Sequence, residues 1–136
     1  MKRSPIRSRS LKSLSVAEAM AQKAFNAYVR ARDYGSPCIS CGKMTELQAG
    51  HYRSVGAAPE LRFDEMNVHG QCHRCNVDLG GNRAGFRVGI AAIYGQHVLD
   101  SLDGHHQAKH YTVSQLKDIR ARYASKAAEL IADMAA

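Results

Sequence analysis

Apolar residues recur every three or four positions in a stretch near the start of the chain, and this spacing predicts an amphipathic helix. Ser15 and Glu18 form an S-x-x-E capping box, a typical helix start. Gly35 and Pro37 follow the last apolar positions and favour a helix end there. We therefore expect a helix over residues 14–35, with an alanine-rich face that packs closely against another element.

A second stretch of the same period closes the chain. Thr112 and Gln115 form a T-x-x-Q capping box, so we expect the final helix to open at Thr112. Four basic residues make much of its outer surface positive: Lys117, Arg120, Arg122 and Lys126. The apolar stripe is explained as core or as a seam for a partner helix, and it consists of Val113, Leu116, Ile119, Tyr123, Ala127, Leu130, Ile131 and Met134.

The middle of the chain, residues 36–83, has little helical period and is rich in glycine, cysteine and histidine. We expect a knuckle at 38–41, a short strand near 47–53, an extended piece at 61–63 and a short helix from about Cys72. Apolar spacing then predicts a helix over 86–93, and a shorter one over 96–102.

The predicted fold class is α+β and mostly helical. A small α+β core is expected at 36–83, flanked by the N-terminal helix at 14–35 and a helical C-terminal part at 84–136. We expect a single domain over 14–136, preceded by a basic flexible tail at 1–13, because 136 residues leave no room for a second large domain.

The charge of the chain favours an anionic partner. There are 19 Lys and Arg against 12 Asp and Glu, a formal net charge of +7, and nucleic acid is the usual partner of so basic a domain. The first 13 residues hold five bases and no acid: Lys2, Arg3, Arg7, Arg9 and Lys12. We expect no secretory signal and no membrane span, and hence a cytoplasmic protein.

Four cysteines form two C-x-x-C pairs, "CISC" at 38–41 and "CHRC" at 72–75. Two intervening residues let both thiolates of a pair converge on one ion, and two pairs complete a closed tetrahedral zinc site. Such a site has no open coordination position, so it predicts a stable module without chemistry of its own. The predicted zinc ligands are Cys38, Cys41, Cys72 and Cys75.

Three polar residues between and beside these pairs suggest chemistry. His51 ends the predicted strand, Asn67 precedes the second cysteine pair, and Asn76 follows it directly. This order is that of the HNH, or ββα-metal, nuclease constellation. The core expected at 36–83 is therefore a small zinc-stabilised ββα-metal (HNH-like) core. A neutral imidazole can take a proton from water, an amide can orient the ring, and an amide oxygen can bind Mg²⁺.

Each of these residues also has an ordinary structural explanation. His51 can be a half-buried strand residue, Asn67 a turn or cap residue, and Asn76 a helix-surface residue. Their joint order between the cysteine pairs favours the nuclease site. His69 and His73 are interpreted mainly as bystanders.

The motifs "CISCG", "AGHYRSVGAAPELRF", "NVHGQCHRCN" and "GN" resemble the NinG family of lambdoid bacteriophages, also called Rap recombination endonucleases. The resemblance covers about residues 14–130. It implies a phage-encoded, metal-dependent endonuclease in the bacterial host that cleaves branched recombination intermediates, such as D-loops and Holliday junctions. By position it makes His51 the general base, Asn67 its orienting residue and Asn76 a ligand of Mg²⁺ or Mn²⁺.

One position departs from the wider HNH pattern. The residue before the histidine is commonly an Asp or His that helps to bind the metal, but here it is Gly50. A second ligand must then come from Asp64, Asp78, Asn82, a backbone carbonyl or the DNA phosphate. We expect a weakly held ion that is completed on DNA.

Contacts to branched double-stranded DNA are expected to be mainly to phosphate, because a branch is recognised by shape. Arg53 is predicted to clamp the scissile phosphate, since it lies two residues beyond His51 on the same strand face. The other candidates for DNA contact are Lys43, Arg62, Arg74, Arg83, Lys2, Arg3, Arg7 and Arg9. The alternative function is a non-catalytic zinc module that binds branched DNA or a recombination partner. A homodimer would suit two symmetric cuts.

Overall fold

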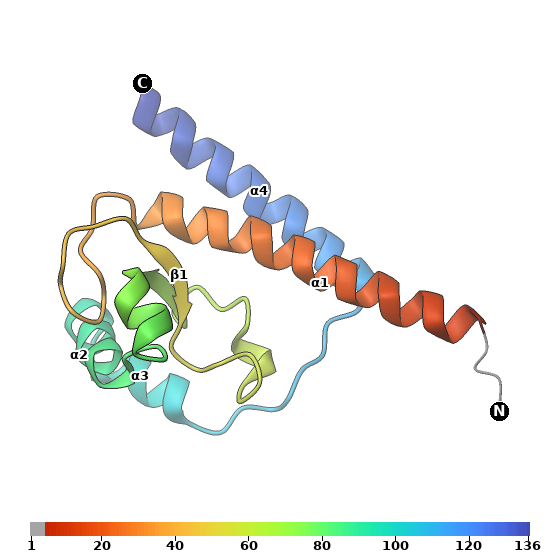
Figure 1. Cartoon of the computed structure of the whole chain (residues 1–136), viewed down its shortest axis with the longest axis horizontal. Helices are drawn as coiled ribbons and strands as arrows, with labels where there is room; N and C mark the ends of the chain where they lie inside the picture. The colour runs from red at the N-terminus through yellow and green to blue at the C-terminus, as the bar shows by residue number, and fades with distance from the viewer. Residues whose placement is uncertain (1–4) are drawn as a thin grey trace. The chain divides into compact units, whose positions relative to one another are not determined.

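The computed structural model describes residues 5–136, with side chains described from residue 13 onward. It is a mixed α+β structure, mostly helical, with a two-stranded sheet (Figure 1). The chain divides into two compact units. One holds α1 as far as Tyr28 together with residues 111–136, and the other is residues 29–110. None of the helices among the described residues is long and apolar enough to span a bilayer.

The first unit is a pair of helices that lie side by side, α1 (Pro5–Arg32) and α4 (Val113–Ala135) (Figure 1). Tyr123 of α4 packs edge-on against Phe25 of α1, with ring centroids 4.6 Å apart, and also contacts Tyr28 at 5.0 Å. The Lys126 ammonium group lies 4.9 Å from the centre of the Tyr28 ring. The apolar stripe predicted for the last helix therefore forms a packed face from Leu116 to Ala127, whereas its last members, Ile131 and Met134, are exposed.

The sequence predicted the start of α4 correctly and the start of α1 incorrectly. The capping box at Thr112 and Gln115 is confirmed, with both of its reciprocal hydrogen bonds present. The predicted helix start at Ser15 is wrong, because α1 already begins at Pro5. Proline is well suited to the first turn of a helix, where its missing N–H has no partner to lose. Residues 5–13, expected in a flexible tail, are thus helical, while Lys2 and Arg3 lie outside the described residues.

The second unit is built on an antiparallel pair of short strands, β1 (Gln48–His51) and β2 (Val68–Gln71). Gln48 lies opposite Gln71, Gly50 opposite His69 and His51 opposite Val68. The first strand was predicted. The second strand was not predicted. An extended piece was expected at 61–63 instead, but the chain there forms a 3₁₀ turn, η1 (Pro59–Leu61), and the residues that follow it.

Three helical segments follow the sheet. They are a single π-helical turn η2 (Arg74–Asp78), α2 (Arg83–Tyr94) and α3 (Gln96–Asp103). The helix predicted at 86–93 and the short one at 96–102 are confirmed, each with slightly wider bounds. An apolar core joins α2 and α3 to the loop between the strands, and its buried members are Tyr52, Ala58, Leu61, Phe86, Ile90, Leu99 and Leu102.

Close backbone approach fixes α2 against the first cysteine pair. A Cβ atom on Gly85 would lie 2.1 Å from the Ser40 carbonyl oxygen, and one on Gly89 would lie 2.2 Å from that of Ile39. Any side chain at these helix positions would therefore push the helix away from the knuckle. The two glycines, four residues apart, form the contact face of the helix.

A buried polar cluster joins the end of α1 to β2. The Asp33 carboxylate accepts hydrogen bonds from the Arg32 guanidinium (2.8 Å) and from the Gly70 N–H (2.8 Å). Arg32 also donates to the Val68 carbonyl oxygen at 2.7 Å and to His69 Nδ1 at 3.0 Å. His69 is only 3% exposed, and its Nε2 donates to the Met66 carbonyl oxygen. This histidine is therefore a structural residue of the core.

The state of His69 gives the fold a testable dependence on pH. Burial, aided by the neighbouring Arg32 charge, lowers the pKa of His69 from 6.5 to about 4. His69 binds a proton more tightly in the unfolded chain than in the folded one. The free energy of unfolding therefore decreases as pH falls from 6.5 to 4, by roughly 3 kcal/mol in total. We expect His69→Gln to lose less stability than wild type between pH 7 and 4.5 in urea titrations.

The exposed His110 supplies the control for that comparison. His110→Gln should keep the wild-type pH dependence, because His110 lies at the surface, outside the buried cluster of Arg32, Asp33 and His69. Parallel pH curves for wild type and His69→Gln would show that His69 is not held neutral.

Candidate metal centre and the residues around it

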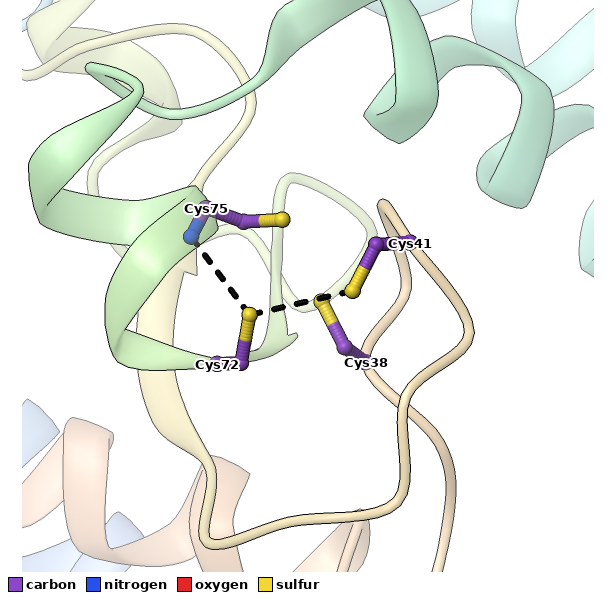
Figure 2. Close-up of side chains that lie close together, drawn as sticks. All are labelled: Cys38, Cys41, Cys72 and Cys75. Carbon is purple, nitrogen blue, oxygen red and sulfur yellow. Dashed lines mark hydrogen bonds between the residues drawn. The ribbon is translucent and has the colours of Figure 1, made fainter.

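The four cysteine sulfur atoms form one cluster, in which all lie within 4.8 Å of one another. Figure 2 shows the two pairs pointing toward each other, Cys38 and Cys41 from the loop after α1 and Cys72 and Cys75 from the segment after β2. Cys41 is exposed, and the other three are almost fully buried. Four convergent thiols are a donor set that fits a tetrahedral ion such as zinc, so this prediction of a metal-binding cluster agrees with the structure.

Backbone hydrogen bonds shape the first pair into a tight turn. The Gly42 N–H donates to the Cys38 carbonyl oxygen at 2.8 Å, and the Cys38 N–H donates to that of Lys43 at 2.9 Å. Gly42 has a φ of +76°, a conformation that favours glycine. The Ile39 N–H donates to the Gly70 carbonyl oxygen at 3.0 Å, which ties the turn to β2.

The second pair is arranged by hydrogen bonds to sulfur. The Cys75 N–H approaches Cys72 Sγ at 3.4 Å, and Asn82 Nδ2 approaches Cys75 Sγ at 3.3 Å. Asn82 has a left-handed backbone with φ of 38°, and its Oδ1 caps α2 by accepting from the Gly85 N–H. Both ends of the Asn82 amide are thus engaged, one as a cap of α2 and the other as a contact to the cysteine cluster. Its role as a ligand of Mg²⁺ or Mn²⁺ stays a prediction.

The two ends of the cluster differ in acidity. Burial acts to raise the pKa of the Cys38 thiol. Hydrogen bonds from the backbone N–H groups of Cys72, Cys41 and Ser40 have the larger, opposite effect and lower this pKa to about 7. Burial raises the pKa of the Cys75 thiol to about 12. A metal ion must therefore displace at least the Cys75 proton, and acid should release the ion.

His51 is the last residue of β1 and is half buried. Its Nε2 lies 3.0 Å from the Arg62 carbonyl oxygen. A carbonyl can only accept, so Nε2 carries the proton of the neutral ring and Nδ1 keeps its lone pair. Burial, with the nearby Arg62 charge, lowers the pKa of His51 below 6.5 despite this hydrogen bond. The ring is held as the neutral tautomer that can accept a proton at Nδ1.

Asn67 is fully buried and binds only backbone. Its Oδ1 accepts from the Arg53 N–H at 2.8 Å, and its Nδ2 donates to the carbonyl oxygens of Arg53 (3.0 Å) and Leu61 (3.1 Å). The Tyr52 N–H donates to the Asn67 carbonyl oxygen. Asn67 therefore fastens both ends of the loop that follows His51, while the Arg62 carbonyl oxygen contacts the ring.

Asn76 lies at the other end of β1. Its Nδ2 donates to Gln48 Oε1 at 2.9 Å, and the Gln48 amide nitrogen lies 3.0 Å from His73 Nδ1. Gln48 and His51 are three residues apart in a strand, about 10 Å. Among residues 13–136, no hydrogen bond links Asn76 to His51. The three predicted residues therefore do not form one cluster. His51 contacts the loop that Asn67 holds, whereas Asn76 contacts Gln48.

Five of the nine predicted DNA contacts lie in the second unit, and three of these are exposed: Lys43, Arg74 and Arg83. Arg53 donates to the Leu102 carbonyl oxygen at 2.9 Å, so its guanidinium is partly used by the end of α3. Arg62 and Arg83 lie over the rings of Phe63 and Tyr52 at 5.4 and 5.8 Å. Lys43 and Arg74 line a cavity of about 640 Å³ beside the cysteine cluster. The side chains of Arg7 and Arg9 lie outside the described ones.

A polar cluster that contains Tyr52, the residue after His51 in the chain, was not predicted from the sequence. The Tyr52 hydroxyl donates a short hydrogen bond to Asp103, and Arg87 donates to the same hydroxyl (2.7 Å) and to Asp103 Oδ2 (2.6 Å). Of the two carboxylates considered as a second metal ligand, Asp64 accepts from the Met66 N–H, and Asp78 lies 3.8 Å from His73. Nothing in the sequence spacing links 52, 87 and 103.

Comparison with known proteins identifies related sequences over nearly the whole chain. The family described as "Bacteriophage Lambda NinG protein" matches residues 2–132. "Protein ninG" of Escherichia phage 933W is 43% identical over 127 residues, and that of Escherichia phage lambda is 42% identical over 127. The match covers 92% of this chain but 63% and 62% of those proteins, so the chain spans about six tenths of their length. No solved structure matches it.

The cysteine cluster predicts the metal content of the chain. We expect one zinc ion per chain by atomic emission spectroscopy, and none in Cys75→Ser, together with a loss of several kcal/mol of unfolding free energy, on the scale typical of structural zinc. Ser36→Ala, an exposed position before the first pair, should retain both. Full stability of zinc-free protein in circular dichroism would contradict a structural role.

Asn67 and Asn76 make a matched pair for a test of stability. Asn67→Ala should destabilise the chain by about 1–3 kcal/mol for each buried backbone group left without a partner. Asn76→Ala removes one hydrogen bond at a half-buried position and should cost less than about 1.5 kcal/mol. Urea unfolding of both variants measures the difference, and equal losses would argue against the fastening role of Asn67.

Proposed function

The chain belongs to the NinG family, and from this premise we propose that it is a metal-dependent DNA endonuclease that cleaves branched recombination intermediates by phosphodiester hydrolysis. The observation that carries the proposal is the His51 ring. Its Nε2 is taken by a backbone carbonyl, its Nδ1 keeps a lone pair, and its pKa is lowered. These are the properties of a general base that works near neutral pH.

The fastened loop supports the same role. Asn67 holds the backbone at Arg53 and Leu61, and the carbonyl group that orients His51 belongs to the next residue, Arg62. The Asn67 amide therefore positions the base through the loop and does not touch the ring. The first cysteine pair is attached to the sheet as well, because the N–H of Ile39, between Cys38 and Cys41, donates a hydrogen bond to the Gly70 carbonyl oxygen of β2.

In the proposed reaction, His51 Nδ1 takes a proton from the attacking water. Arg53, two residues further on, is the proposed contact to the scissile phosphate, with one of its nitrogens already held by Leu102. A divalent Mg²⁺ or Mn²⁺ ion, when bound, would stabilise the negative charge on the departing oxygen. Asn76 keeps an oxygen atom with no hydrogen-bond donor among the described residues, which fits such an ion by donor type.

The other basic side chains supply the attraction to DNA in this proposal. Lys43 and Arg74 flank the cavity beside the cysteine cluster, and neither side chain has an ion-pair or hydrogen-bond partner among residues 13–136. Unpaired cations on one face are available to phosphate. The same observation favours the second candidate function, a zinc module that binds branched DNA without cutting it.

A nicking assay on a synthetic four-way junction separates the two functions. We expect the zinc-loaded chain to cut the junction with Mg²⁺ or Mn²⁺, and His51→Ala to lose at least 100-fold in rate, as is typical for removal of a general base. His110→Ala, which alters an exposed histidine in the connector, should cut at the wild-type rate.

Three outcomes of this assay decide the proposal. Equal rates for wild type and His51→Ala would remove His51 from its role. Junction binding without any cleavage by wild type would favour the binding module, especially if Lys43→Ala and Arg74→Ala weaken that binding. Equal cleavage of a linear duplex and of the junction would contradict selectivity for branched DNA.

A further inference from the structure

Two arginines of α2 contact the same buried tyrosine. Arg87 donates from Nη1 to the Tyr52 hydroxyl at 2.7 Å and to Asp103 Oδ2 at 2.6 Å. The Arg83 guanidinium lies over the Tyr52 ring, 5.8 Å from its centroid. Tyr52 is only 3% exposed, whereas both arginines are exposed. One tyrosine, held in the core, therefore positions two cations at the surface of the second unit.

A third arginine approaches the same place. Arg53 donates to the carbonyl oxygen of Leu102, the residue before Asp103, at 2.9 Å, and its charge acts on the Asp103 carboxylate. Among residues 13–136, Asp103 is the only acid that forms an ion pair with any of these arginines. Three guanidinium groups therefore share one carboxylate, and the cluster keeps an excess of positive charge.

Arg87 also keeps unused hydrogen-bond donors. A guanidinium has five N–H groups, and the two contacts of Arg87 are both made by Nη1. Its Nε and Nη2 groups have no partner among the described residues. This pair of nitrogens is the fork that binds a phosphate through two parallel hydrogen bonds. Arg83 has no hydrogen-bond partner in residues 13–136 either, and its recorded contact is the Tyr52 ring.

A purely structural role explains less of this arrangement. The side chains of Arg87 and Asp103 are 45% and 31% exposed, and ion pairs so open to solvent add little stability. Tyr52 already links its loop to α3 through its own hydrogen bond to Asp103. Arg83 lies in the first turn of α2, where the helix dipole disfavours a cation and no acid accompanies it. A bound anion would offset this electrostatic cost.

We propose that Arg83 and Arg87 form a second phosphate-binding site for the DNA backbone, beside the phosphate that Arg53 contacts. The inference rests on the proposed function for its ligand, branched DNA, and adds a contact beyond the scissile phosphate. The two arginines are four residues apart, so they lie on one face of α2 and can hold one segment of backbone. Tyr52 and Asp103 are positioning residues, which act on the DNA through the arginines.

The test measures DNA affinity apart from cleavage. Zinc-loaded variants are made in the His51→Ala background, and fluorescence anisotropy follows binding of a labelled four-way junction from about 50 to 200 mM salt. We expect Arg83→Gln and Arg87→Gln each to bind about tenfold more weakly, as for a lost charged hydrogen bond. Each should also reduce the slope of log affinity against log salt by about one.

Arg30→Gln is the matched control for charge. It removes the same charge from an exposed position of the second unit, away from Tyr52 in the contacts of the fold. This variant should keep the salt slope and nearly all of the affinity, because exposed charges distant from the DNA are screened. Zinc content and circular dichroism confirm that each variant is folded.

A double-mutant cycle tests the positioning role of Tyr52. Tyr52→Phe keeps the ring and the net charge but removes the hydroxyl that holds Arg87. It should weaken junction binding about threefold when Arg87 is present, and have no effect in Arg87→Gln. An equal effect in both backgrounds would show that the hydroxyl acts on the fold alone and would overturn its positioning role.

Unchanged affinity and salt slope in folded Arg83→Gln or Arg87→Gln would overturn the proposed site. Losses no larger than that of Arg30→Gln would do the same, because they would report a general effect of charge. The inference and the endonuclease fail separately. Cleavage by wild type, with unchanged junction affinity in the arginine variants, refutes only the inference. Junction binding that depends on both arginines, without cleavage by wild type, refutes only the endonuclease.

Discussion

The convergence of two cysteine pairs is the constraint on which the second unit depends. Cys38 and Cys41 come from the loop after α1, and Cys72 and Cys75 follow β2, yet all four sulfur atoms lie within 4.8 Å. A sheet of two four-residue strands is too small to be stable alone. A metal ion in this cluster would close a loop that contains both strands, and so would hold a segment rich in polar residues that has little apolar core of its own.

Around that cluster, the stabilising contacts are mainly between backbone groups and amide side chains. Asn67 fastens the loop between the strands, Asn82 caps α2 beside Cys75, and Gln71 joins both cysteine segments to Gly50. Amides suit this purpose because each one both donates and accepts without charge, which makes burial less costly than for a carboxylate. His51 is placed by this framework, and its ring is set by the Arg62 carbonyl group.

The sequence predicts the periodic elements and the metal cluster best. The capping box at Thr112 and the C-x-x-C spacing are local signals, so they identify α4 and the four cysteines directly. The second strand and the buried state of His69 were missed, because they depend on partners distant in sequence, such as Arg32 and Asp33 for His69. The start of α1 was misplaced, because the capping box at Ser15 was favoured over Pro5. The separation of Asn76 from His51, and the place of Gln71 over Gly50, follow from strand register, which residue order alone does not give.

The pH dependence of cleavage reports directly on whether His51 acts as a neutral base. The measurement is the single-turnover rate of junction nicking from pH 5 to 9 at saturating Mn²⁺. Protonated His51 cannot accept a proton, so the rate should fall on acidification through one apparent pKa below 6.5, in line with the direction in which burial moves the pKa of His51. A level rate above pH 7 is the predicted result. A rate that still rises about tenfold per pH unit above pH 7 would show that another base activates the water.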